Sequence, residues 1–253
     1  MSSQVLQVRA ISKSFNQNKQ QQIVALESVS LTVRSGEFVS LLGPSGCGKS
    51  TLLDLVAGLI GPDQGDILLG EHSILGKRGF VSYMPQNDLL FPWRTVLDNV
   101  MIPLQLQGIP TEKARQQAQE FLPLFGLANF SQSYPDMLSG GMRQRAALLR
   151  TYLCHKDVML LDEPFGKLDA LTKVQMQQWL LDIWQHFKHS VLFVTHDIDE
   201  AILLSDRIYL LSSRPGRIQA EISVDLPRPR RPRIATDGAF TKIKEKIYGF
   251  LEG

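Results

Sequence analysis

The chain has 253 residues, of which 43% are hydrophobic and 21% are charged, and its formal net charge is +2. This length can bury one large core, and so small a net charge gives no global basic field for nucleic acid. Two cysteines are too few for a disulfide framework, so we expect a reducing cytosol. We expect no signal peptide, and no apolar run approaches the roughly 20 residues of a membrane helix, so membrane work would need another chain.

Two N-terminal segments predict half-buried strands. Apolar residues alternate over residues 5–9 and 29–33, and residues 14–22 between them form a polar hairpin tip. Phe15 closes the first strand. It is either an aromatic that stacks on a nucleotide base or an ordinary edge aromatic, and the spacing alone leaves both interpretations open.

A glycine-rich loop follows the next predicted strand. Residues 38–42 predict a buried strand, residues 52–56 carry the apolar face of a helix, and the pattern G-x-x-x-x-G-K-S lies between them. Backbone N–H groups of such a loop and the positive end of the helix dipole bind a polyphosphate. Lys49 would reach the β- and γ-phosphates, and the Ser50 hydroxyl would bind Mg²⁺. We therefore predict nucleotide binding by Gly43, Pro44, Ser45, Gly46, Cys47, Gly48, Lys49, Ser50 and Thr51.

The pattern changes from strands to helices after residue 87 and returns to strands at residue 157. Thr111 can cap a helix within the helical segment, and Pro123 should end that helix early. Residues 158–161 are uniformly apolar, which is typical of a parallel sheet, and Thr172 opens a further helix. We predict an α/β fold, with a P-loop NTPase core, an N-terminal antiparallel β subdomain and an inserted α-helical subdomain.

Acidic, amide and imidazole groups follow three of the predicted strands. Asp162 and Glu163 end one strand, where ligands bind in open α/β sheets. Phosphoryl transfer needs a carboxylate for Mg²⁺, a role that suits Asp162, and a group that orients water, a role that suits Glu163. Gln86 and His196 are weak signals when taken singly. Together with Lys49 and Glu163 they predict a γ-phosphate site, in which Gln86 contacts Mg²⁺ or water and His196 holds the γ-phosphate.

A second anion-binding device lies inside the helical segment. Ser139, Gly140 and Gly141 open a predicted helix, and a helix N-terminus of this kind also attracts a phosphate. Two such devices serving one ATP within one subunit would be redundant. We therefore expect this Ser-Gly-Gly turn to complete the nucleotide site of a second copy.

The C-terminal tail has a different composition. Residues 226–233 alternate proline with arginine, which excludes a helix, and an amphipathic helix carrying Phe240, Ile243, Ile247 and Leu251 on one face follows. Four arginines over eight residues form only a small patch for nucleic acid or an anionic lipid surface.

Taken in order, these motifs closely resemble the ATPase subunit of an ATP-binding cassette (ABC) transporter. The resemblance covers roughly residues 5–220. It implies a head-to-tail dimer with two ATP molecules bound between phosphate loops and signature turns, Asp169 at the seam, and Phe15 stacked on adenine. The implied domains are residues 1–86 with 150–226 (ATP-binding core), 87–149 (helical signature subdomain) and 227–253 (basic tail).

A narrower resemblance, to importers of nitrate, sulfonate, taurine and thiamin pyrimidine precursors, rests on residues 86–100, 195–201, 213–218 and the tail. It implies two copies per transporter, integral-membrane permease subunits, a periplasmic or lipid-anchored solute-binding protein acting indirectly, and a peripheral position on the cytoplasmic face of the bacterial plasma membrane. Phe91 and Trp93 would dock on the permease, with helical-lobe core as the alternative. Lys167 departs from the family, which more often has a small residue there.

Other classes of function fit the sequence less well. A soluble cassette ATPase that acts on nucleic acid or the ribosome would share the site chemistry, but such proteins usually carry tandem cassettes or a long coiled coil. This chain has one cassette and no sustained heptads. A non-catalytic nucleotide sensor is excluded because Glu163 and His196 are both present. We expect ATP and Mg²⁺ as cofactors and no nucleic-acid partner.

Overall fold

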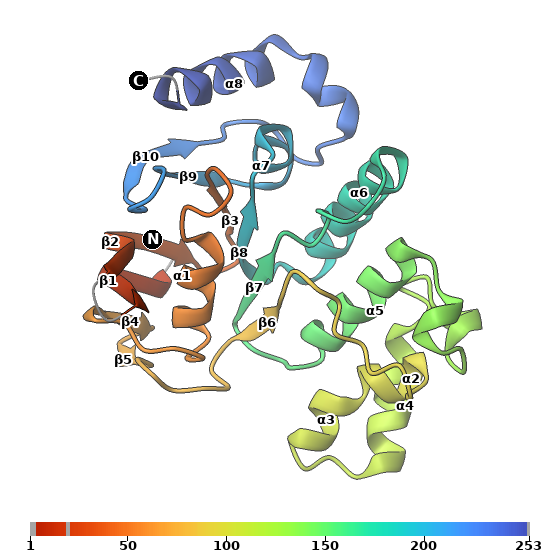
Figure 1. The fold of residues 1–253 in the computed structure, drawn as a ribbon. Coiled ribbons are helices and arrows are strands. Elements are labelled where there is room, and N and C mark those ends of the chain that lie inside the picture. Colours follow the sequence, from red (N-terminus) through yellow and green to blue (C-terminus); the bar gives the residue numbers. More distant parts are fainter. Residues whose placement is uncertain (1–3, 19–20, 252–253) are drawn as a thin grey trace.

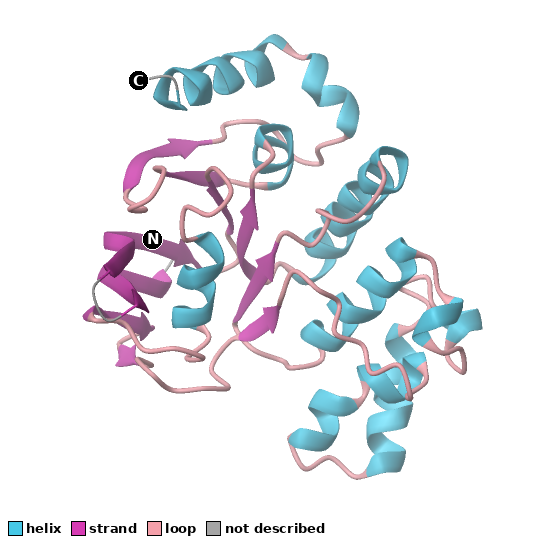
Figure 2. Ribbon diagram, in the orientation of Figure 1, coloured by secondary structure: helices cyan, strands magenta, loops and turns pink. Residues whose placement is uncertain are grey.

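The computed structural model describes residues 4–18 and 21–251, which form two β-sheets surrounded by helices (Figures 1 and 2). The antiparallel sheet has the strand order β2-β1-β4-β5, and the larger sheet has the order β10-β9-β3-β8-β7-β6. The strands are β1 (Gln4–Asn18), β2 (Gln21–Arg34), β3 (Phe38–Leu42), β4 (Gln64–Leu69), β5 (His72–Ser73), β6 (Ser82–Met84), β7 (Val158–Asp162), β8 (Ser190–Thr195), β9 (Arg207–Leu211) and β10 (Ile218–Ser223).

Helices fill the space between the sheets and cover the larger one. Helix α1 lies between the two sheets, α2 to α5 form a helical subdomain at one side, and α8 lies beyond β10 (Figure 1). The bounds are α1 (Lys49–Val56), α2 (Val96–Val100), α3 (Ile102–Leu106), α4 (Thr111–Phe121), α5 (Gly140–Tyr152), α6 (Ala170–Phe187), α7 (Ile198–Leu204) and α8 (Gly238–Leu251), with short 3₁₀ turns at Ala128–Phe130, Pro135–Met137 and Pro232–Thr236.

Strand β7 shows why the larger sheet has continuous apolar strands. Its side chains alternate between two apolar clusters: Val158 and Leu160 pack on the side of α1, and Met159 and Leu161 pack on the side of α5 and α6. It pairs in parallel with β6 and β8. A parallel strand covered on both faces needs no polar alternation, as the sequence predicted.

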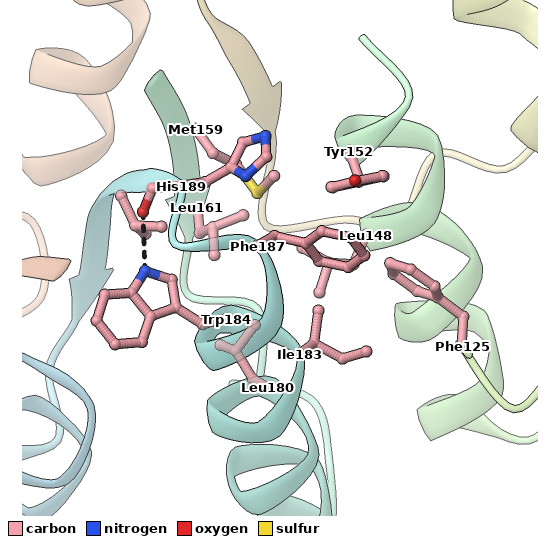
Figure 3. A pocket seen from close by; sticks show the side chains of 11 residues that line it. Phe125, Leu148, Tyr152, Met159, Leu161, Leu180, Ile183, Trp184, Phe187 and His189 are labelled. Atoms are coloured by element: carbon pink, nitrogen blue, oxygen red, sulfur yellow. Dashed lines mark hydrogen bonds between the residues drawn. The ribbon is translucent and has the colours of Figure 1, made fainter. Parts of the chain in front are cut away.

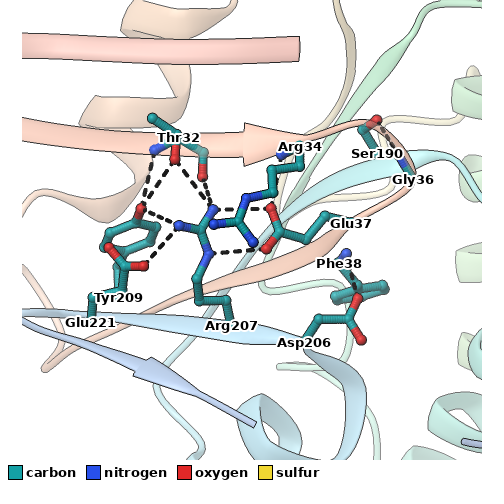
Figure 4. Close-up of polar contacts among 10 residues, drawn as sticks. All are labelled: Thr32, Arg34, Gly36, Glu37, Phe38, Ser190, Asp206, Arg207, Tyr209 and Glu221. Carbon is teal, nitrogen blue, oxygen red and sulfur yellow. Dashed lines mark hydrogen bonds and ion pairs between the residues drawn. The ribbon is translucent and has the colours of Figure 1, made fainter. Parts of the chain in front are cut away.

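A buried arginine joins the antiparallel subdomain to the larger sheet (Figure 4). The Arg207 guanidinium on β9 donates to the Thr32 carbonyl of β2 at 2.7 Å and to Glu37 Oε2 at 3.0 Å. It also donates to Glu221 Oε1 of β10 at 2.8 Å and to the Tyr209 hydroxyl at 3.0 Å. Because each donor finds a close acceptor, the buried charge is compensated and fixes β2 beside β9.

The helical subdomain meets the core through aromatic and aliphatic side chains (Figure 3). Phe125, Leu148 and Tyr152 face Leu180 and Phe187 of α6 around a small cavity of about 30 Å³. Trp184 at this junction donates its indole N–H to the His189 carbonyl at 2.8 Å, as the dashed line in Figure 3 shows. The junction sets where the N-terminus of α5 lies relative to the sheet.

The N-terminal strands and the start of α4 differ from the predicted elements. Strands β1 and β2 run farther than residues 9 and 29, so most of the predicted polar tip is paired strand; residues 19 and 20 lie outside the described residues. Thr111 is the first residue of α4 and not its cap, because Pro110 holds the cap position. Helix α4 ends at Phe121, and Pro123 therefore ends it early as predicted.

The arginines of the tail contact the core of the same chain. Arg230 is 1% exposed and donates to the Ile202 and Ser205 carbonyls at the C-terminal end of α7, at 3.1 Å and 2.5 Å, and to Val224 and Leu226. Arg228 forms a 2.7 Å ion pair with Asp206. Two of the four arginines are thus used inside the fold, which weakens the tail further as a nucleic-acid or lipid surface.

Candidate functional site

The phosphate loop lies between the end of β3 and the first turn of α1. Gly48 caps α1 in a left-handed conformation with φ +109°. A Cβ atom at Gly48 would lie 2.7 Å from Leu26 Cδ2 and 2.9 Å from the Ala25 carbonyl oxygen. Only glycine therefore allows this left-handed turn and the close approach of β2 to the loop.

A cavity of about 390 Å³ opens over this loop. It brings together nine of the predicted site residues, which come from β1, the phosphate loop and the ends of β6 and β7. They are Phe15, Ser45, Gly46, Gly48, Lys49, Ser50, Thr51, Gln86 and Glu163. One cavity therefore offers an aromatic side chain, the backbone of the phosphate loop, and the charged side chains of Lys49 and Glu163.

Lys49 is held inside the phosphate loop although its side chain is only 5% exposed. Its Nζ donates to the carbonyls of Gly43 and Pro44, at 2.8 Å and 2.9 Å. The same Nζ lies 3.8 Å from Glu163 Oε1. Hydrogen bonds and a nearby carboxylate compensate this buried ammonium group and aim it at the cavity.

Glu163 occupies a strained backbone position directly after β7. Its φ is +43°, a left-handed value that a residue other than glycine rarely adopts, and its N–H donates to the Val194 carbonyl at 3.0 Å. Glu163 Oε2 lies 3.1 Å from His196 Nδ1. The turn therefore presents this carboxylate between Lys49 and His196, and such strain is found most often at functional sites.

Asp162 is buried beneath the cavity and is 3% exposed. Burial raises the pKa of its carboxyl group, while the Ser50 hydroxyl acts in the opposite direction. Among the described residues its Oδ1 atom has no hydrogen-bond partner, which is costly for a buried carboxylate. Next to the Ser50 hydroxyl, this oxygen fits a hard cation that also binds phosphate. Within the described residues no group of three or more His, Cys, Asp or Glu side chains could hold a metal ion alone.

The other predicted site residues lie outside this cavity. Gly43, Pro44 and His196 line a neighbouring cavity of about 500 Å³, which also contacts Phe250 and Leu251 of α8. Cys47 and Asp162 are buried and line neither cavity. The Ser139–Gly140–Gly141 turn and Asp169 are not among the described residues that line either cavity.

The Ser-Gly-Gly turn and Asp169 instead cap their own helices. The exposed Ser139 side chain accepts from the Met142 N–H at 3.3 Å at the start of α5. The exposed Asp169 side chain accepts from the Thr172 N–H at 3.1 Å at the start of α6. Hydrogen bonds from the Thr172 side chain and from its N–H hold the pKa of Asp169 below its ordinary value. Asp169, and not Thr172, is therefore the residue that opens α6.

The segment after Gln86 presents two aromatic rings to solvent. Phe91 and Trp93 are 39% and 71% exposed, and their stacked ring centroids are 5.2 Å apart. The buried Asn99 side chain holds the loop, because it donates to the carbonyls of Phe91 and Arg94 and accepts from the Phe91 N–H. The interpretation of these aromatics as helical-lobe core is wrong. Lys167 donates to Asn87 Oδ1 and so contacts the start of the same segment.

Three residues that line the cavity were not predicted: Ile23, Ala25 and Arg214. The sequence signal for Arg214 is the motif at residues 213–218, which supports the narrower resemblance but does not indicate a place in the nucleotide site. Its place beside the phosphate loop depends on a contact across more than 160 residues of sequence.

A parallel sheet with a phosphate loop, a buried strand-end aspartate and an adjoining glutamate defines a nucleotide-binding P-loop ATPase. The family model described as "ABC transporter" matches residues 26–166. The chain belongs to the ABC transporter family, and it is an ATP-binding subunit with ATPase activity.

Relatives and solved structures agree with this assignment. The chain is 43% identical to the nitrate import ATP-binding protein NrtD of Synechocystis over 93% of this chain and 91% of that protein. It is 41% identical to the aliphatic sulfonates import ATP-binding protein SsuB of Bacillus cereus, over 95% and 93%. It is 43% identical to the formylaminopyrimidine import ATP-binding protein ThiZ of Halalkalibacterium halodurans, over 89% of each.

Two solved structures of the bacterial ABC transporter cassette MJ0796 have the same fold. One is a dimer, with a TM-score of 0.76 and 30% identity, and it covers 88% of this chain and all of that one. The other is a dimeric post-hydrolysis state bound to ADP and Pi, with a TM-score of 0.76 and 29% identity. The predicted fold class is thereby confirmed. No helix among residues 4–18 and 21–251 is long and apolar enough to cross a membrane.

Proposed function

We propose that this protein is the ATPase subunit of an importer, and that two copies bind two ATP molecules head to tail. The observation that carries the proposal is the separation of the two halves of the site. The cavity around Lys49 and Glu163 contains one set of nucleotide contacts, and the Ser-Gly-Gly turn at the start of α5 lies outside that cavity. A second copy of the chain supplies the turn that each cavity lacks.

Residues in and around the cavity have different roles in the proposed reaction. Phe15 stacks on adenine, the loop from Gly43 to Thr51 holds the phosphates, and Ser50, Gln86 and Asp162 would hold Mg²⁺. The bound Mg²⁺ would neutralise charge that develops on the phosphates. Glu163 orients the attacking water, and His196, 3.1 Å from Glu163, holds the γ-phosphate. Ser139, Gly140, Gly141 and Asp169 act on the ATP of the other copy.

The exposed aromatic pair is the proposed contact with the membrane permease. Phe91 and Trp93 follow the Mg²⁺-contacting Gln86 along the chain, and Asn99 holds their loop in place. Movement at the γ-phosphate would therefore reach the permease through a short, well-supported segment. The subunit lies at the cytoplasmic face of the bacterial plasma membrane, and a solute-binding protein outside that membrane delivers the solute to the permease.

The solute is a small molecule of the nitrate, sulfonate, taurine or thiamin pyrimidine precursor type. The three named relatives import nitrate, aliphatic sulfonates or formylaminopyrimidine according to their names. A cassette ATPase that acts on nucleic acid or the ribosome is the alternative. It is less well supported, because Arg228 and Arg230 of the basic tail are used inside the fold.

The partner can be identified by affinity purification of the tagged chain from gently solubilised native membranes, followed by mass spectrometry. We expect a polytopic permease in near-equal amount. The double variant F91A/W93A should lose this permease and keep its affinity for ATP, because neither ring lines the ATP cavity. Recovery of ribosomal or nucleic-acid-binding proteins without a permease would overturn the proposal.

A further inference from the structure

The loop between β9 and β10 packs against two walls of the nucleotide cavity. We call residues 212–217 the clasp loop. Its Gly216 N–H donates to the Ala25 carbonyl at 3.0 Å, and the Gly216 carbonyl accepts from the Glu27 N–H at 3.0 Å. Arg217 adds a 2.7 Å ion pair with Glu27. The clasp loop is therefore fixed to β2, the strand whose Ile23 and Ala25 line the cavity.

The clasp loop also touches the phosphate loop without a gap. A Cβ atom at Gly216 would lie 2.3 Å from the Cys47 carbonyl oxygen and 3.1 Å from Leu26 Cδ2. No side chain fits between the two backbones. The Ser212 hydroxyl accepts from the Arg217 N–H at 2.9 Å and closes the loop internally. The clasp loop is thus a rigid part of the cavity wall.

Arg214 projects from the clasp loop to the tip of the phosphate loop. Its Nη2 and Nε donate to the Gly46 carbonyl, at 2.8 Å and 3.2 Å. A guanidinium group has five N–H donors, and these two bonds leave three of them for another acceptor. Arg214 is exposed and lines the cavity. Among the described residues lining it, Lys49 and Arg214 carry positive charge, and Glu163 carries negative charge.

We propose that Arg214 is a nucleotide-binding residue whose guanidinium group contacts the phosphate chain of the bound nucleotide. Its bonds to Gly46 hold the group in place before the ligand arrives, so little side-chain entropy is lost on binding. The planar fork suits phosphate oxygens, and hydrogen bonds between ionised groups are stronger than neutral ones. The inference rests on the proposed nucleotide site and adds a recognition element from the opposite end of the chain.

The test is calorimetric titration of the purified full chain with ATP and with ADP at several salt concentrations. We expect R214M to weaken ATP binding roughly 10-fold at low salt, with a smaller loss as salt screens the lost charge. R214K should keep part of the affinity, because it retains the charge without the fork. R217M is the matched control, because Arg217 is in the same loop but does not line the cavity. Its ion pair with Glu27 is exposed and contributes little, and the two backbone bonds of Gly216 keep the loop in place, so R217M should bind ATP as the wild type does.

The outcomes separate this inference from the nucleotide site itself. If the wild-type chain binds neither ATP nor ADP, the proposed nucleotide site is wrong. If the wild type binds and R214M binds equally well, only the role of Arg214 is wrong. A loss in R214M that is the same at every salt concentration would also contradict the inference, because it would indicate a distorted loop and not a missing charge. Thermal unfolding of R214M without nucleotide checks that the variant is folded.

Discussion

The N-termini of α1 and α5 both offer glycine-rich turns to a phosphate, but their surroundings differ. The N-terminus of α1 is enclosed by β2, the clasp loop and the acidic end of β7, and it opens into the 390 Å³ cavity. The N-terminus of α5 begins at an exposed Ser139 whose hydroxyl accepts from its own helix at 3.3 Å. The first turn is part of an enclosed site, and the second begins at an exposed residue and lines neither cavity.

This difference shows how one chain can carry two anion-binding devices without redundancy. Helix α1 belongs to the core and α5 belongs to the helical subdomain, and the two are joined through the aromatic contacts around Tyr152 and Phe187. In the proposed head-to-tail dimer, the cavity of one chain and the α5 turn of another form a complete site. The variants below alter one half at a time, from the largest expected effect to the smallest.

The largest effect is expected when the carboxylate of Glu163, which lines the cavity, is neutralised. Glu163→Gln preserves side-chain size at the left-handed turn with φ +43°, but it removes the charge that we propose orients the attacking water. We expect ATP hydrolysis to fall by roughly 10² to 10⁴ while ATP binding is retained. Phosphate release and an ATP titration measure the two quantities. Glu120→Gln on the exposed surface of α4 is the control, and near-normal turnover of E163Q would refute the role of Glu163.

The next effect concerns Arg230, a buried arginine that supports the C-terminal end of α7. Arg230 holds the C-terminal carbonyls of α7, the helix that follows His196. Burial lowers the pKa of Arg230 to about 10, so the group is still charged at neutral pH. Arg230→Met leaves these buried carbonyls without donors and should lower the free energy of unfolding by about 2–4 kcal/mol. Urea unfolding measures this loss, and the exposed Arg233→Met should change it by less than about 0.5 kcal/mol.

A moderate effect is expected at the α5 turn. Ser139→Ala removes a helix cap and the hydroxyl that we propose contacts the second copy's ATP, so hydrolysis should fall about 10-fold. The affinity of the single subunit for ATP should not change, because Ser139 does not line the cavity of its own chain. Titration at a protein concentration too low for dimers separates the two quantities. Weakened ATP binding under that condition would argue against completion by a second copy.

The smallest effect concerns the ion pairs that join the start of α6 to the segment after His196. Lys173, in the first turn of α6, donates to Asp197 and Glu200 at 2.8 Å each, and Asp197 follows His196. Burial would raise the pKa of Asp197, but hydrogen bonds from Lys173 and the Glu200 N–H outweigh it and hold this pKa below its ordinary value. Lys173→Met should therefore cost about 1 kcal/mol of stability at neutral pH.

The sign of the pH dependence follows from the lowered pKa of Asp197. Its contribution to stability is present above the pKa of the unfolded state, about 3.9, and is lost as the pH falls through the folded value. The difference between the wild type and K173M in urea unfolding should thus shrink below about pH 4. A difference that is constant from pH 7 to pH 3 would contradict the ion pair.

Local patterns predicted most of the core. The phosphate loop, the strand before Asp162 and the early end of α4 depend on neighbours within one element, so spacing and residue type suffice. The ends of β1 and β2 were missed, because polar residues pair through their backbones and leave no apolar alternation. The cap of α4 was assigned one residue late, since Pro110 has no side-chain cap to signal it.

Contacts across long sequence separations were not predictable. Arg230 lies in a run of prolines and arginines that is typical of an exposed tail, yet its guanidinium group finds five carbonyls within a buried site. Arg214 reaches Gly46 only because Gly216 allows the two loops to touch. In both cases the partner is a backbone oxygen, which carries no sequence signature.

The most direct test of the account mixes two inactive variants. Lys49→Ala destroys the cavity side of a chain, and Ser139→Arg blocks its α5 turn. In a head-to-tail dimer of one K49A and one S139R chain, the S139R chain offers an intact cavity and the K49A chain offers an intact turn, so one complete site forms. We predict that ATP hydrolysis by the mixture clearly exceeds the sum of the separate rates. Activity that stays at that sum, while the two chains demonstrably form mixed dimers, would contradict a site shared between copies.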